Sequence, residues 1–167
     1  GDWLDMAYYR EHEELPTYGF TPDADFPAIY GEKGILSLHA SYPLAGSGIV
    51  SAKGGNAVNM VADQAEILLA DGEKICMSGI SAHGSTPEEG ENAISKAMEA
   101  AADKSSFAAV YMQKIGFRLH GEGLGLDFCD EESGSLTMNV GTISSDETEL
   151  TLGIDIRYPV TLARDVI

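Results

Sequence analysis

The sequence predicts an α+β fold in which an antiparallel sheet carries helices packed on one face, and two observations support this. Residues 34–80 and 136–160 contain alternating apolar and polar runs separated by tight-turn signals, as strands of antiparallel sheets do. Between them, residues 86–103 have the apolar spacing of a helix that packs against such a sheet. Strands combined with one or two strong helices are typical of a two-layer sandwich.

The N-terminal residues combine a helix with a loop. WLDMAYYREHEE, residues 3–14, has the spacing of a short amphipathic helix that ends before Pro16. TYGFTPDADFPAIYGEKG, residues 17–34, is rich in Pro, Gly and Asp and shows no periodicity. We therefore expect an ordered loop that leads into the first strand.

Strand signals dominate the next segment. ILSLHASY (residues 35–42) alternates, and GSGIVSAKGG (residues 46–55) is rich in turn residues. In AEILLADGEKICMSG (residues 65–79), the pair Asp71-Gly72 separates two apolar runs and predicts a tight hairpin.

The helix predicted over residues 86–103 has its own start signals. Thr86 is the candidate N-cap and Pro87 suits the first helical position. Its apolar stripe consists of Ala93, Ile94, Ala97, Met98 and Ala101. FAAVYMQKIG (residues 107–116) predicts a second helix, and residues 136–160 predict a final hairpin of two strands.

Composition excludes some function classes. The chain has 27 acidic and 10 basic residues and a net charge of -17, so a nucleic acid or an anionic membrane would be repelled. No apolar run is long enough to span a bilayer and no signal peptide is visible, so we expect a cytoplasmic protein. Cys76 and Cys129 lack the spacing of zinc or redox motifs, which predicts buried thiols.

No complete catalytic motif is present. The GxSxG, GxxxxGK and HExxH patterns are absent, and the glycines of HGEGLGLDF (residues 120–128) are expected in a loop. Four polar residues stand in unusual places: Asp23, Asn59, His83 and Arg157. Each has an ordinary structural explanation as a turn, bulge or ion-pair residue. His83 precedes the predicted helix, where partial positive charge would keep its imidazole neutral, although it could equally bind its own loop.

Taken together, several segments resemble one family. They are GFTPDADFPAIYGEKGIL, GGNAVNMVADQAEILL, SGISAHGSTPEEGENAI, HGEGLGLDFCDEESGSLTMNVGTI and DIRYPVT. In this order they resemble the dipeptidase branch of the aminoacylase/carboxypeptidase superfamily of zinc exopeptidases, which includes peptidase V.

The resemblance implies a catalytic domain with two zinc ions and an inserted lid domain. Residues 1–33 would be a short remnant of the catalytic domain with its linker, and residues 34–167 a ferredoxin-like, dimerisation-like lid. The family's other metal ligands have no matching position in this chain. We therefore expect the chain alone to bind no zinc and to be inactive without the missing catalytic domain.

Site roles follow from the same resemblance. It makes Asp23 a metal ligand and His83 the donor that stabilises the oxyanion of a dipeptide substrate. Arg157 would hold the substrate's C-terminal carboxylate through two parallel hydrogen bonds. Asn59 would fix the substrate backbone, with Asn139 as the second choice.

Two departures from the family lead to a further expectation. Asp71-Gly72 joins two strands where family members carry a longer segment with a helix, and the chain ends where another lid helix would start. We expect an incomplete lid with exposed apolar surface. Two function classes stay open: a lid portion of a metal-dependent dipeptidase, or a non-catalytic binding or assembly domain. The first requires Asn59, His83 and Arg157 to converge on one face.

Overall fold

The computed structural model describes residues 4–19, 29 and 31–167, in two compact units, Gly1–Gly31 and Glu32–Ile167. In the first unit, α1 (Leu4–His12) confirms the predicted helix, and no residue of α1 is buried. The rings of Tyr8 and His12 stack with centroids 3.9 Å apart. Asp23 and most of the predicted loop around it lie outside the described residues.

The second unit is built on a six-stranded sheet with the order β1-β8-β7-β2-β3-β4. Every strand pairing in this sheet is antiparallel, as predicted. The strands are β1 (Gly34–Pro43), β2 (Ile49–Gly54), β3 (Gln64–Leu69), β4 (Lys74–Ser78), β7 (Thr137–Ser145) and β8 (Glu149–Tyr158). A small separate sheet pairs β5 (Cys129–Asp130) with β6 (Gly134–Ser135).

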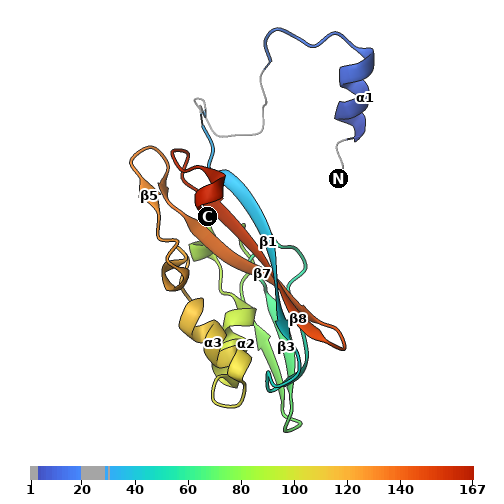
Figure 1. The fold of residues 1–167 in the computed structure, drawn as a ribbon, viewed down its shortest axis with the longest axis vertical. Helices are drawn as coiled ribbons and strands as arrows, with labels where there is room; N and C mark the ends of the chain where they lie inside the picture. Colours follow the sequence, from blue (N-terminus) through green and yellow to red (C-terminus); the bar gives the residue numbers. More distant parts are fainter. Residues whose placement is uncertain (1–3, 20–28, 30) are drawn as a thin grey trace. The chain divides into compact units, whose positions relative to one another are not determined.

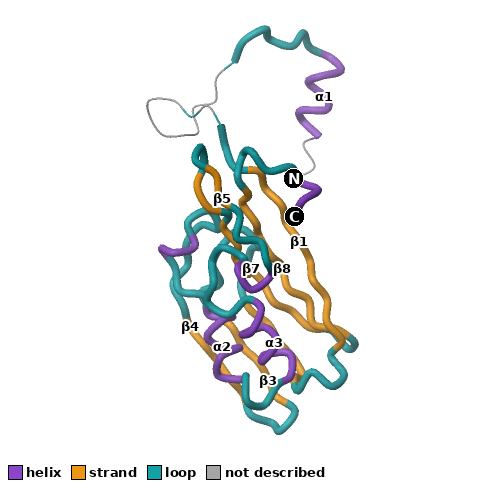
Figure 2. The backbone as a smooth tube through the Cα atoms, turned by 60° about the vertical axis from the view of Figure 1, so that its left-hand side comes forward, coloured by secondary structure: helices purple, strands orange, loops and turns teal. Residues whose placement is uncertain are grey.

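Two helices, α2 (Ala93–Ala101) and α3 (Ser106–Lys114), lie side by side on one face of the sheet (Figures 1 and 2). The predicted apolar stripe of α2 is buried in full, in the same core as strand residues such as Ile67, Val140 and Ile154. The predicted two-layer α+β sandwich is therefore confirmed. Short 3-10 helices, η1 (Pro87–Glu89), η2 (Glu122–Leu124) and η3 (Arg164–Val166), lie in the connections.

The helix predicted over residues 86–103 begins later than its start signals indicated. Pro87 opens only the 3-10 turn η1, and Gly90 then adopts an extended conformation. Asn92 is the actual N-cap, because its side chain accepts from the backbone N–H groups of Ile94 and Ser95. A Pro signal cannot distinguish one short turn from a long helix, whereas the second polar residue, Asn92, makes the capping contacts.

Two other expectations are revised. The turn-rich segment of residues 46–55 contains strand β2, since only its ends turn, at Gly46, Gly48 and Gly55 with positive φ. Both cysteines are exposed rather than buried. Apolar neighbours did not predict burial because strand side chains alternate, so Ile75 enters the core while Cys76 faces outward.

The sheet is composed of two halves joined at one end. β2 and β7 pair only at Lys53↔Ser144 and Gly54↔Ile143, so β1-β8-β7 and β2-β3-β4 are otherwise independent ladders. The loop after β2 packs against β7: a Cβ on Gly141 would lie 2.1 Å from the Val58 carbonyl oxygen. The loop after β2 therefore lies against the sheet near the junction of its two halves.

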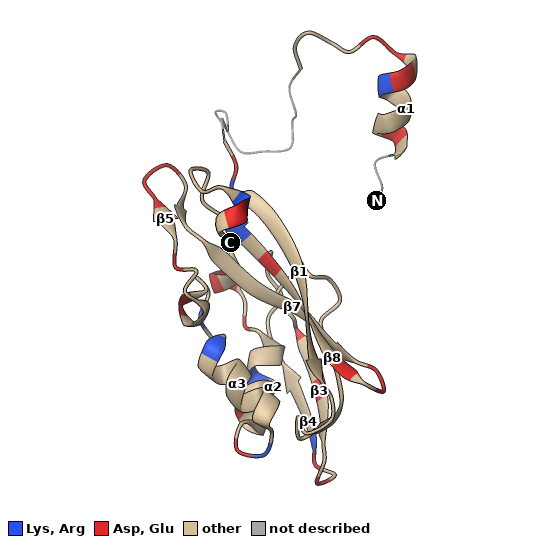
Figure 3. Ribbon diagram, in the orientation of Figure 1, with Lys and Arg blue, Asp and Glu red and all other residues tan. Residues whose placement is uncertain are grey.

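Charge is distributed unevenly over this frame. Figure 3 shows acidic residues mainly in loops and at strand ends, with few charged residues along the strands. None of the helices in the described part of the chain is long and apolar enough to cross a membrane.

Candidate functional site

Three residues predicted from the sequence lie in segments that come together. Asn59 lies in the loop between β2 and β3, and His83 in the turn after β4. These two loops pair through their backbones: Gly84 N–H donates to the Asn59 carbonyl at 2.8 Å, and Val61 N–H donates to the Ala82 carbonyl at 2.8 Å. The loops that carry Asn59 and His83 therefore form one unit.

The paired loops lie against β8 at Asp155. Gly84 is buried and has no side chain, and a Cβ there would be 2.7 Å from Asp155 Oδ2 and 3.0 Å from the Asn59 carbonyl oxygen. Arg157 Nε donates to the same Oδ2 at 2.8 Å. The segments that carry Asn59, His83 and Arg157 thus meet around one carboxylate.

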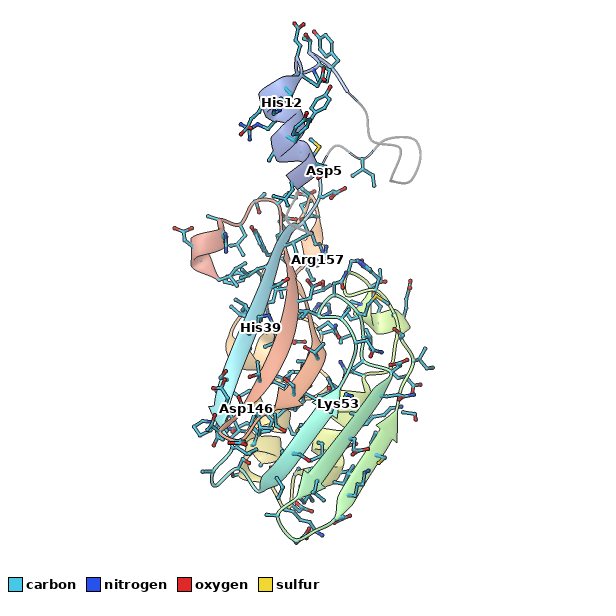
Figure 4. All side chains as sticks on the ribbon, turned by 90° about the vertical axis from the view of Figure 1, so that its right-hand side faces the viewer. Asp5, His12, His39, Lys53, Asp146 and Arg157 are labelled. Atoms are coloured by element: carbon cyan, nitrogen blue, oxygen red, sulfur yellow. The ribbon has the colours of Figure 1, made fainter. Side chains whose placement is uncertain are left out.

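The position of Arg157 follows from the strand pattern. Residues two apart on a strand share a face, so Asp155 and Arg157 point to the same side of β8. The core residues Ile154 and Ile156 occupy the helix side. Figure 4 views the sheet from the side away from α2 and α3 and shows Arg157 near the end of β8. The Arg157 side chain is mostly covered, with 14% of it exposed.

His83 is exposed and bound within its own turn. Its Nδ1 lies 2.7 Å from Ser85 Oγ and accepts the Ser85 backbone N–H at 3.2 Å. Because Nδ1 accepts this N–H, the tautomer that fits the turn carries its proton on Nε2. The helix start predicted next to His83 is wrong, since α2 begins ten residues later.

The two asparagine candidates, Asn59 and Asn139, differ in exposure and in hydrogen bonding. Asn59 is exposed, and only its backbone carbonyl is engaged in the contacts above. Asn139 is 3% exposed, donates to the Met60 carbonyl at 2.8 Å and accepts from Asn92 Nδ2 at 3.2 Å. Asn139 is therefore a structural link between β7, the Met60 loop and the start of α2.

Sequence reasoning missed Asp155. It is the only charged residue among the buried residues that the structure describes, and its Oδ1 has no hydrogen-bond partner there. The spacing Asp-x-Arg on a strand was the available signal, because it places the two side chains on one face.

No metal site is present in the described part of the chain. No group of three or more His, Cys, Asp or Glu side chains there is arranged to hold an ion. Asp23, the predicted ligand, lies outside the described residues. The described residues do not fit a zinc centre, which needs about four ligands.

A cavity of about 390 Å³ lies elsewhere, between α2, the end of α3 and β7. Its lining includes Asn139 but none of the three converging residues. Ser95 Oγ lies 2.9 Å from the Tyr111 hydroxyl and donates to the Gly116 carbonyl. Burial raises the pKa of Tyr111, so its hydroxyl stays protonated. The Ser95 and Tyr111 hydroxyls are therefore already paired inside the fold.

Comparison with known proteins gives a consistent set of relatives. Residues 70–160 match the family described as "Peptidase dimerisation domain". The chain is 34% identical over 207 aligned positions to the protein named "Putative dipeptidase YtjP" of Bacillus subtilis, covering 99% of the chain and 45% of the relative. It is 30% identical over 204 positions to "Putative dipeptidase SH1171" of Staphylococcus haemolyticus, covering 95% and 43%. The chain therefore spans less than half the length of these relatives.

Proposed function

Because the chain belongs to the family of peptidase dimerisation domains, we propose that residues 34–167 are the lid portion of a metal-dependent dipeptidase. Relatives named as dipeptidases support this, as does the approach of the Asn59, His83 and Arg157 segments to one carboxylate. That approach is the observation that carries the proposal, because an assembly domain would not require it.

His83 would act as an oxyanion donor. The Ser85 N–H bound to Nδ1 favours a proton on Nε2, and that nitrogen has no partner within the described chain. A neutral imidazole N–H directed at an oxygen that becomes negative in the transition state lowers the barrier by about 3 kcal/mol. The turn would supply this donor already oriented.

Arg157 would bind the C-terminal carboxylate of a dipeptide. A planar guanidinium offers two parallel N–H donors to a carboxylate, which lysine cannot match. Asn59, which is exposed beside the His83 turn, would hold the peptide backbone of the substrate. All three residues bind or orient the substrate.

The described residues do not form a metal centre, so we assign no metal-dependent step to them. Hydrolysis by the whole protein would need groups that residues 34–167 do not supply. Asp23 stays a candidate ligand on the resemblance alone. We expect the chain by itself to be inactive.

A second candidate function is association with another domain or chain. β1 is an outer strand of ten residues whose free edge has no partner in the described chain, and its Ile35 and Leu38 are 56% and 39% exposed. Long exposed edges of this kind pair readily with other strands. Light scattering that shows a clean monomer at high concentration would remove this candidate.

The lid proposal is tested by nuclear magnetic resonance on the 15N-labelled chain. We expect alanyl-alanine to shift the Arg157 side-chain and His83 signals, and its C-terminal amide to leave Arg157 unchanged. Arg164, which is exposed in η3 after the end of β8, is the internal control. Equal shifts at Arg157 and Arg164, or equal effects of acid and amide, would contradict the assignment. Zinc-dependent hydrolysis by the chain alone would contradict its expected inactivity.

A further inference from the structure

Asp155 has a place in the site that the ordinary role of an ion-pair partner does not explain. Its side chain is 1% exposed, on β8, and a lone buried carboxylate costs stability unless its oxygens are satisfied. Only Oδ2 has a partner, while Oδ1 has none in the described chain. A buried acid with one unsatisfied oxygen needs an explanation other than stability.

We propose that Asp155 is a positioning residue. It sets both the orientation of the Arg157 guanidinium and the position of the His83–Gly84 turn. The proposal rests on the proposed function, since it concerns how the substrate contacts are held. Asp155 touches no substrate and acts through its two neighbours, Arg157 and the His83–Gly84 turn.

The first neighbour is the Arg157 guanidinium. The pair is single, from Nε to Oδ2, so neither terminal nitrogen of the guanidinium is used by Asp155. No other described residue binds these nitrogens. A two-fold pairing would have engaged Oδ1 and one terminal nitrogen. The single contact therefore fixes the guanidinium by its inner nitrogen and leaves both outer nitrogens for a carboxylate.

The second neighbour is the His83–Gly84 turn. Gly84 packs so closely on Oδ2 that a Cβ would lie 2.7 Å away, and it binds the Asn59 carbonyl at the same point. One carboxylate oxygen therefore contacts both Arg157 and the backbone next to His83. Moving Asp155 Oδ2 would therefore change the distance between the Arg157 guanidinium, which would bind the substrate carboxylate, and the His83 imidazole, which would donate to the oxyanion.

The test compares Asp155→Asn with Thr137→Val by nuclear magnetic resonance. Asparagine keeps the shape but weakens the acceptor, so Arg157 Hε should exchange with water about tenfold faster. The dissociation constant of alanyl-alanine should rise by roughly three- to tenfold because the guanidinium is less well oriented. Thr137 lies directly across from Arg157, and its buried hydroxyl has no partner in the described chain. Its replacement should change neither value.

The outcomes separate the two proposals. Unchanged Arg157 exchange in Asp155→Asn, or unchanged dipeptide affinity beside faster exchange, would overturn the positioning role. Loss of binding without faster Arg157 exchange would also overturn it. If alanyl-alanine shifts no Arg157 signal in the native chain, the proposed function fails, while the exchange measurement still decides whether Asp155 orients Arg157.

A measurement on the native chain tests the positioning role even if the Asp155→Asn variant does not fold. In the native chain, Arg157 Hε should exchange about tenfold more slowly than Arg164 Hε, because Arg157 Nε is hydrogen-bonded and its side chain is mostly covered, whereas Arg164 is exposed. Equal exchange rates would overturn the proposal. Signals of residues in α2 and β3, recorded with every variant, report any general loss of structure.

Discussion

The amide of Asn92 should stabilise the fold by more than an ordinary helix cap. Its Oδ1 accepts from Ile94 N–H at 2.9 Å and Ser95 N–H at 3.3 Å. Its Nδ2 donates to the Val140 carbonyl at 2.8 Å and to Asn139 Oδ1 at 3.2 Å. Asn92→Ala removes a cap, which costs about 1 kcal/mol. It also withdraws a donor from two buried acceptors, which adds about 1–2 kcal/mol.

We therefore expect Asn92→Ala to lower the free energy of unfolding by about 2–3 kcal/mol. This corresponds to a fall in Tm of roughly 8–12 °C for a unit of this size. Thermal unfolding followed by circular dichroism measures it.

Two further variants divide that loss into its parts. Asn92→Ser retains a capping oxygen and loses the donor, so it should lie between the native chain and Asn92→Ala. Asn92→Asp caps as well as asparagine but sets a negative oxygen against two acceptors, so it should be less stable than Asn92→Ser. Thr86→Ala is the matched control, since Thr86 makes no capping bond and its loss should cost less than about 0.5 kcal/mol. An Asn92→Asp chain as stable as the native one would refute the role of the amide donor.

Three other perturbations have defined outcomes. Gly84→Ala should cost about 1–3 kcal/mol and speed Arg157 Hε exchange, because the new Cβ would press on Asp155 Oδ2; native stability with unchanged exchange would count against the close contact. Desolvation raises the pKa of Asp130, but hydrogen bonds from Ser133 and Thr161 outweigh it and hold the pKa below its ordinary value of 3.8. Its stabilisation is therefore present above about pH 4 and lost as the pH falls further, so the stability gap between the native chain and Asp130→Asn should narrow in acid denaturation below pH 4. Both cysteines should react with a thiol reagent in the folded chain without denaturant, and slow reaction limited by unfolding would contradict their exposure.

The fold was accessible from the sequence where periodicity was strong. The apolar stripe from Ala93 to Ala101 determined α2, and alternation determined the last hairpin, because burial on one face imposes those periods. Strand β2 was less apparent, because the glycines at both ends of its six residues indicated turns. The start of α2 was misplaced because Thr86-Pro87 and Asn92 are both valid signals, and only tertiary contacts with Val140 select the second.

The candidate site was accessible in part. Asn59, His83 and Arg157 stood out through the resemblance, but their approach to one another depends on strand order and loop pairing, which periodicity does not encode. Asp155 was missed because a single acid in a strand reads as an outward residue, and only register and loop packing show that it is covered. The sequence could not decide between Asn59 and Asn139 as the residue that would hold the substrate backbone, because it does not show which of the two is buried.

The pairing of β1 with β8 has a consequence for synthesis on the ribosome. β1 comprises residues 34–43, and the strand that completes its ladder comprises residues 149–158. The β2-β3-β4 ladder and its helix α2 need only residues up to 101. Contacts between distant segments form slowly because a long loop must close first. During translation, β1 therefore stays unpaired until residues 149–158 have emerged, and in this interval it is most exposed to pairing with a wrong strand.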